Sequence, residues 1–203
     1  MAQEVYTELY EVMKSRRGPY TGLEIPEFYA MVEKLFTPQE AEVNNVMTRK
    51  PATAAEIAGE MNRDENEIKA ILETMADKGL CKTFLKDDLR LYQGEPFMPG
   101  IFEYQFMSGK DTDRHRNLAG LIKAYKKAFN AAKGELKMTF PITRVIPVDR
   151  TIEAGNTVHT YDQVSTYIDK NEKIGFGTCY CRQASKLVGE DIHDMPMEVC
   201  MWF

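Results

Sequence analysis

The sequence predicts an α+β protein, and three observations lead to this prediction. Apolar residues recur at helical spacing through most of the first hundred residues, a short alternating segment follows three of these helices, and three of the four cysteines lie in the last 25 residues. We therefore divide the chain into a helical region ending in a hairpin at residues 1–100, a linking helix at residues 101–137 and a small α+β region at residues 138–203.

Two helices are predicted at the start of the chain. Apolar residues at spacing four predict a helix over residues 4–15, which the Arg-Arg-Gly-Pro segment at residues 16–19 ends. A second helix is predicted over residues 26–35, because the proline at its first position is tolerated in the first turn of a helix.

Three more helices and a hairpin follow. Residues 37–40 and 53–56 have the capping-box pattern, in which a threonine and a glutamate three residues later bond to each other's backbone N–H groups. Each of these patterns opens a short helix. The third helix of this group is predicted over residues 64–78, with Gly79 at the left-handed position that ends it. Alternating residues on both sides of a turn at residues 86–88 then predict two strands.

Three short helices followed by a hairpin form the winged-helix pattern, which raises the possibility of DNA binding. A recognition helix needs basic and amide side chains, but residues 64–78 carry five acidic residues against two basic ones, and the hairpin turn adds two acids. Repulsion from phosphates argues against nucleic acid as a partner, so we favour a docking or dimerisation module.

The linking region begins with an aromatic segment at residues 101–109 that we expect to be packed, followed by a long helix over residues 113–132. This helix is the most basic part of the chain, with Arg114, Arg116, Lys123, Lys126, Lys127 and Lys133. The basic side of residues 113–133 is either a solvated face or an electrostatic docking site for an acidic redox partner. We expect His115 to be exposed among these charges, and Cys81 to be a small buried hydrophobe.

In the last region, strands are predicted over residues 138–148, 158–160 and 173–178, and a helix over residues 161–169. The last of these strands leads directly into Cys179.

The bulk composition excludes several classes of protein. A net charge of −5 gives no general attraction to nucleic acid, and no apolar run approaches the roughly 20 residues of a membrane span. The N-terminal segment lacks the pattern of a secretory signal. We therefore expect a cytoplasmic protein, a compartment in which clustered cysteines are more often metal-binding or redox-active than disulfide-bonded.

The candidate site comprises Cys179, Cys181 and Arg182, followed by His193 and Cys200. Thiolates and imidazole are metal ligands, and Arg182 would stabilise anionic sulfur. The residues alone leave three possibilities: a cubane iron–sulfur cluster on the three cysteines with His193 or an outside ligand, a structural zinc site with three cysteines and one histidine, or no metal. Zinc favours a spacing of two to four residues between cysteines, so the Cys-x-Cys spacing counts mildly against zinc.

The C-terminal segment, Cys-x-Cys-Arg and then His-Asp-Met-Pro-Met-Glu-Val-Cys at residues 193–200, resembles a family of 4Fe–4S-binding proteins from anaerobic bacteria and archaea. The family motif is Cys-x-Cys-Arg and then Cys-Asp-x-Pro-x-Glu-x-Cys. The winged-helix pattern and residues 96–103 and 143–148 are similar to that family as well. The resemblance implies an electron-transfer or redox-linked protein, whose relatives typically continue into a ferredoxin-like domain.

The chain departs from the family pattern at His193, where the family has cysteine, and at Phe203, where relatives continue. A histidine ligand would tend to raise the reduction potential of a cluster and make it sensitive to pH.

We therefore expect an iron–sulfur protein for electron transfer or redox sensing, with Cys179, Cys181, His193 and Cys200 as ligands of the cluster or metal and no catalytic residue. The sequence has no Gly-rich phosphate loop and no nucleophile elbow, which argues against a self-contained hydrolase or kinase. Two alternatives stay open: a redox-responsive winged-helix transcription regulator, and a zinc-stapled protein-interaction module.

Overall fold

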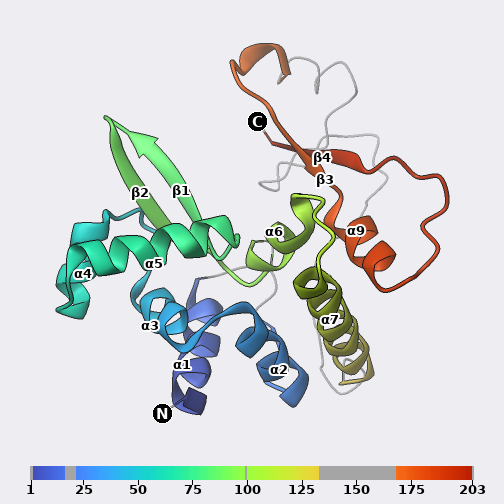
Figure 1. Cartoon of the computed structure of the whole chain (residues 1–203), viewed down its shortest axis with the longest axis horizontal. Helices are drawn as coiled ribbons and strands as arrows, with labels where there is room; N and C mark the ends of the chain where they lie inside the picture. Colours follow the sequence, from blue (N-terminus) through green and yellow to red (C-terminus); the bar gives the residue numbers. More distant parts are fainter. Residues whose placement is uncertain (1, 17–21, 99, 133–167, 203) are drawn as a thin grey trace, which may run out of the picture.

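Helices and two small antiparallel sheets alternate along the chain in a computed structural model that describes residues 2–16, 22–98, 100–132 and 168–202. The elements, shown in Figure 1, are α1 (Ala2–Ser15), α2 (Pro26–Leu35), α3 (Pro38–Val46), α4 (Ala54–Met61), α5 (Glu65–Asp77), β1 (Cys81–Lys86), β2 (Leu89–Gly94), α6 (Ile101–Met107), α7 (Asp113–Ala132), β3 (Gly175–Thr178), α9 (Tyr180–Leu187) and β4 (Glu198–Trp202). The protein is therefore α+β, as the sequence predicts.

Local capping signals explain where α3 and α4 begin. The Thr37 hydroxyl accepts a bond from the Glu40 N–H at 3.3 Å, and the Glu40 carboxylate accepts one from the Thr37 N–H at 2.8 Å. Thr53 and Glu56 form the same reciprocal pair at 3.2 and 2.7 Å. Both predicted capping boxes are confirmed, and each satisfies N–H groups that a helix start would otherwise leave unpaired.

The hairpin after α5 also follows the prediction. Strands β1 and β2 pair antiparallel from Cys81 opposite Gly94 to Lys86 opposite Leu89. The turn residues Asp87 and Asp88 both have positive φ angles, 50° and 61°, which match the right-handed twist of a two-residue hairpin loop. The hairpin projects away from the helices in Figure 1.

One expectation about the linking region is confirmed and one needs correction. Residues 101–107, expected to be packed, have Ile101, Phe102 and Phe106 buried; they form the helix α6, whose start is held by a bond from the Gly100 N–H to the Glu103 carboxylate at 2.6 Å. His115, expected to be exposed, is only 8% exposed. Its Nδ1 lies 2.6 Å from the Thr112 hydroxyl, because Thr112 precedes α7 and the ring turns back toward that helix start.

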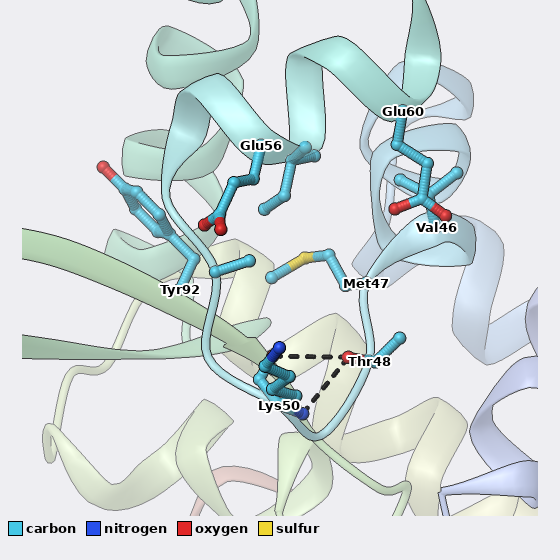
Figure 2. A pocket seen from close by; sticks show the side chains of 9 residues that line it. Val46, Met47, Thr48, Lys50, Glu56, Glu60 and Tyr92 are labelled. Carbon is cyan, nitrogen blue, oxygen red and sulfur yellow. Dashed lines mark hydrogen bonds between the residues drawn. The ribbon is translucent and has the colours of Figure 1, made fainter.

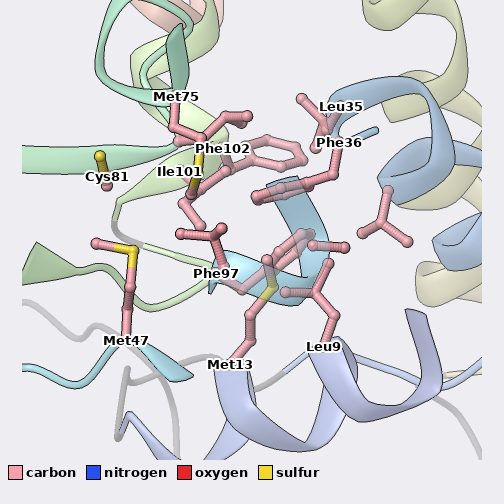
Figure 3. Packing of buried hydrophobic residues seen from close by; sticks show 14 of the residues in the cluster. Leu9, Met13, Leu35, Phe36, Met47, Met75, Cys81, Phe97, Ile101 and Phe102 are labelled. Atoms are coloured by element: carbon pink, nitrogen blue, oxygen red, sulfur yellow. The ribbon is translucent and has the colours of Figure 1, made fainter. Parts of the chain in front are cut away.

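Buried apolar side chains from the helices and from the segment after β2 form one core, part of which Figure 3 shows. Phe97 and Phe102 are fully buried near its centre, with ring centroids 5.5 Å apart. Beside this core, the guanidinium of Arg16 is 3% exposed and donates to the Asn44 side chain at 2.7 Å and the Met47 carbonyl at 2.8 Å. This arginine fastens the end of α1 to the end of α3.

The last elements rest on α6 and α7. The side chain of Gln183 in α9 donates to the carbonyls of Gly109 and Lys110, both at 3.2 Å, and the ring of Tyr180 packs on Phe102. The predicted strand at residues 173–178 is present as β3, which pairs antiparallel with β4. The strands predicted at 138–148 and 158–160, and the helix predicted at 161–169 except its last two residues, lie outside the described residues.

No helix in the described ranges has both the length and the apolar character that crossing a membrane requires.

Candidate metal centre

The three C-terminal cysteines meet at the junction of β3, α9 and β4. Cys179 immediately precedes α9, and Cys181 lies in the first turn of that helix. Cys200 lies on β4 opposite Gly177, two residues before Cys179, so strand pairing brings it back to the start of α9. The Cys179 N–H also donates to the Met197 carbonyl at 2.6 Å, which ties the start of α9 to the segment before β4.

Neighbouring groups shift the pKa of the Cys200 thiol. Burial raises this pKa, and the nearby Cys179 and Cys181 raise it further. In the opposite direction, the backbone N–H of Tyr180 donates to the Cys200 sulfur and lowers its pKa. Cys179 and Cys181 are therefore close enough to Cys200 for negative charges on these sulfurs to repel one on Cys200. A bound cation would relieve this repulsion, so the thiol group is chemically suited to a metal.

Tyr180, between the two cysteines in sequence, is part of the same arrangement. Burial raises the pKa of its hydroxyl, and a hydrogen bond with Cys181 raises that pKa further. Its ring lies edge-on to Phe102 with centroids 6.0 Å apart, and the ammonium of Lys126 lies 5.6 Å from the Tyr180 ring centroid. The tyrosine therefore connects the thiol group to α6 and α7.

The thiols do not form a finished coordination shell. Within the described ranges, no three histidine, cysteine, aspartate or glutamate side chains are arranged to hold a metal ion. The donor set nevertheless suits a thiophilic metal or an iron–sulfur cluster, because it consists of thiols with a backbone N–H directed at one sulfur.

His193 makes its contacts away from the three thiols. It occupies the long loop between α9 and β4, which swings outward in Figure 1. Its backbone N–H bonds to the Asp191 carboxylate at 2.8 Å and its Nδ1 lies 3.3 Å from the same carboxylate, while 79% of its side chain is exposed. Among the described residues, the hydrogen bonds and ion pairs of His193 all run to Asp191, so the structure does not bring the imidazole to the thiols.

Arg182 makes a structural contact with the backbone. Its guanidinium donates to the Pro196 carbonyl and so joins α9 to the segment that leads into β4. The stabilising charge that the sequence led us to expect from Arg182 is therefore directed at the backbone of the loop in this arrangement.

The basic residues of α7 are largely engaged within the chain. Arg116 forms ion pairs with Asp111 at 2.8 Å and Asp113 at 3.1 Å, and Lys123 pairs with Glu190 at 2.7 Å. Lys126 instead lies over two aromatic rings beside the thiols. Lys126 was expected only as one of the basic residues of 113–133, and Tyr180 was given no role. The position of Tyr180 between two cysteines was the one signal that could have identified it.

A pocket lies between the end of α3, the start of α4 and β2, but it offers little room (Figure 2). Its volume is about 50 Å³. The Thr48 hydroxyl in its wall bonds to the Lys50 backbone, and the Glu56 carboxylate is occupied by its capping box. We assign no function to it.

The acidic residues predicted to oppose DNA are at the surface. Four of the five acids of residues 64–78 are exposed, and Asp87 and Asp88 are exposed at the hairpin turn.

Comparison with known proteins identifies no relative: no protein-family model and no curated protein matches the chain. The case for a function therefore rests on the residues and their geometry.

Proposed function

We propose that this protein binds an iron–sulfur cluster of the 4Fe–4S type through Cys179, Cys181 and Cys200, and that it serves electron transfer or redox sensing. The observation that supports this most directly is the pairing of β3 with β4, which brings Cys200 back to the start of α9, close enough to Cys179 and Cys181 for both to raise its pKa. The resemblance of the C-terminal motif to 4Fe–4S proteins of anaerobes favours a cluster over a single zinc ion.

The residues of the chain have separate tasks in this proposal. The three thiolates would hold the cluster, which would supply reversible one-electron chemistry. The Tyr180 N–H donates to the Cys200 sulfur and stabilises its negative charge. The start of α9 carries the positive end of the helix dipole, which would stabilise an anionic cluster held beside it.

The three cysteines leave the fourth iron of the cluster to be held by another ligand. His193 is the candidate within the C-terminal motif, but its contacts with Asp191 hold it on the outer loop. Binding by His193 would require that loop to turn inward and the bonds to Asp191 to break.

The N-terminal region would act as a winged-helix docking or dimerisation module. Helices α3, α4 and α5 followed by the β1–β2 hairpin have the order of a winged helix, and Ala52 adds a backbone bridge to Tyr92 at the edge of the hairpin. The exposed acids of α5 would repel phosphates, which argues against the transcription-regulator alternative. We propose a cytoplasmic protein whose redox partner is acidic and approaches α7.

Metal analysis on protein purified without oxygen tests the proposal. We expect about four irons and four acid-labile sulfides per chain, with broad visible absorption that bleaches on reduction. One zinc ion per chain without sulfide would replace the proposal with a zinc-stapled module, in which metal removal unfolds the C-terminal region without redox chemistry. Absence of both metals would reject a metal centre on these cysteines.

A further inference from the structure

A pocket between α7 and α9 has Cys181 in its wall. Its volume is about 100 Å³, and Cys181 forms part of its wall together with Lys123, Lys126, Ser185 and Glu190. The rest of the wall consists of apolar side chains from the two helices. A cavity needs only about 10–15 Å³ of such space to hold one water, so the pocket has room for several waters or a small ligand.

Most of the charge in the pocket is already neutralised. The Lys123 ammonium lies 2.7 Å from the Glu190 carboxylate, which also accepts a bond from the Ser185 hydroxyl at 2.6 Å. Lys123 consequently lowers the pKa of Glu190, which remains an anion paired with its lysine.

Lys126 supplies the remaining positive charge. Its ammonium lies 5.2 Å from the Phe102 ring centroid and 5.6 Å from that of Tyr180, which are distances typical of cation–π contacts. Among the described residues, no carboxylate lies within ion-pair distance of Lys126. From further away its charge opposes the burial that raises the pKa of Glu103, and adds to the effect of Lys123 in lowering the pKa of Glu190. The two rings hold the charge in place without cancelling it.

We propose that this pocket attracts a small anion to Cys181 and that Lys126 provides the attraction. The two rings keep the charge of Lys126 beside the pocket, where it attracts anions at low ionic strength. The ligand class is a singly charged anion of about three or four heavy atoms, such as a short carboxylate. The pocket and its charge belong to the chain itself. The inference rests on the proposed function in one respect only, that an anion in the pocket would lie next to a cluster bound by Cys181.

Alkylation of Cys181 provides the test, with iodoacetate as the anionic probe and iodoacetamide as the neutral probe of the same size. Both reagents form a carbon–sulfur bond with the same thiolate and release iodide, so the ratio of their rates cancels the fraction of ionised thiol. The ratio is measured on the full chain, as purified and after metal chelation, with peptide mapping to separate Cys181 from the other cysteines.

We expect Lys126→Gln to lower the iodoacetate-to-iodoacetamide ratio at Cys181 about threefold at low salt, the effect of one charge at close range. Lys126→Arg should retain the wild-type ratio, and high salt should reduce the wild-type ratio toward that of Lys126→Gln. Lys127→Gln is the matched control, since it removes the same charge from the next residue of α7, outside the pocket wall.

An unchanged ratio in Lys126→Gln, or an equal decrease in Lys127→Gln, would overturn the proposal. Circular dichroism identifies any variant that is misfolded, and Lys126→Met then repeats the charge removal with a different side chain. The ratio in chelated protein is independent of iron, so a chain without a cluster would reject the proposed function and leave this test intact.

Discussion

Cys200 on β4 lies opposite Gly177 on β3, two residues before Cys179, which precedes α9. The pairing of β3 with β4 therefore brings Cys200 back beside the strand end that leads to Cys179. The site therefore depends on strand register as well as on the Cys-x-Cys spacing. Residues that are distant in sequence complete it.

The first prediction concerns the cysteines. Cys179→Ala and Cys200→Ala should each lower the iron and sulfide content by about tenfold or more. Loss of a residue that only supports a metal ligand typically lowers metal affinity about 10–100-fold, and loss of the ligand itself should lower it at least as much. Metal and sulfide analysis of anaerobically purified protein measures this effect.

Cys81→Ala is the matched control for these variants. Cys81 is buried in the hairpin, where burial raises the pKa of its thiol to about 12 and makes it a poor ligand. Its variant should keep the wild-type iron content. Full iron content in Cys200→Ala, or equal loss in Cys81→Ala, would contradict the assignment of the site.

The second prediction concerns His193. His193→Ala should retain the iron and sulfide content and the reduction potential of the wild type, because the imidazole is exposed and held by Asp191. Asp191→Ala serves as the companion variant, since it releases the imidazole without removing it. A cluster that is lost in His193→Ala, or a potential that changes with pH only when His193 is present, would instead identify His193 as the fourth ligand.

Much of the helical part of the fold could be predicted from local sequence. The starts of α3 and α4 are encoded within four residues each, by Thr37 with Glu40 and by Thr53 with Glu56. Helix α6 was missed because its seven residues are mostly aromatic, and packing of Phe102 and Phe106 in the core stabilises it rather than helix propensity.

The candidate site was predictable only in its composition. The grouping of cysteines is visible in the sequence, but the roles of Arg182 and His193 depend on the path of the loop between α9 and β4. Lys126 could not be identified because its distance to Tyr180 arises from the packing of α7 on α9. Sequence spacing carries no information about such a contact between distant helices.

The third prediction concerns stability at mildly acidic pH. Burial lowers the pKa of His115 from its ordinary value of 6.5, and the charges of Arg114 and Lys110 lower it further while Asp111 opposes them. The unfolded chain therefore binds this proton more readily than the folded chain, so the free energy of unfolding should decrease as the pH falls below about 6.5. Urea titrations at pH 7.5 and pH 5.5 measure the change.

His115→Gln isolates the contribution of this histidine. The variant keeps a polar side chain near Thr112 but cannot titrate, so the part of the pH dependence due to His115 should disappear. An identical loss of stability between pH 7.5 and pH 5.5 in the variant and the wild type would show that other groups are responsible.

The fourth prediction concerns Arg16. Its guanidinium donates to Asn44, to the Met47 carbonyl and to the Glu95 carbonyl at 3.1 Å, and 3% of the residue is exposed. Arg16→Met preserves much of the volume but leaves these buried acceptors without a donor. We expect the free energy of unfolding to decrease by about 3–5 kcal/mol, the range for breaking a buried charged network.

Arg49→Met is the control for Arg16, because Arg49 is exposed and its guanidinium donates a long bond, at 3.4 Å, to the Arg16 carbonyl. Its effect should stay within about 0.5 kcal/mol, as is usual for surface substitutions. Urea unfolding of both variants at neutral pH compares the two positions directly. Similar losses for Arg16 and Arg49 would mean that the buried bonds of Arg16 contribute no more than an exposed contact, and α1 would then be held to α3 by apolar packing alone.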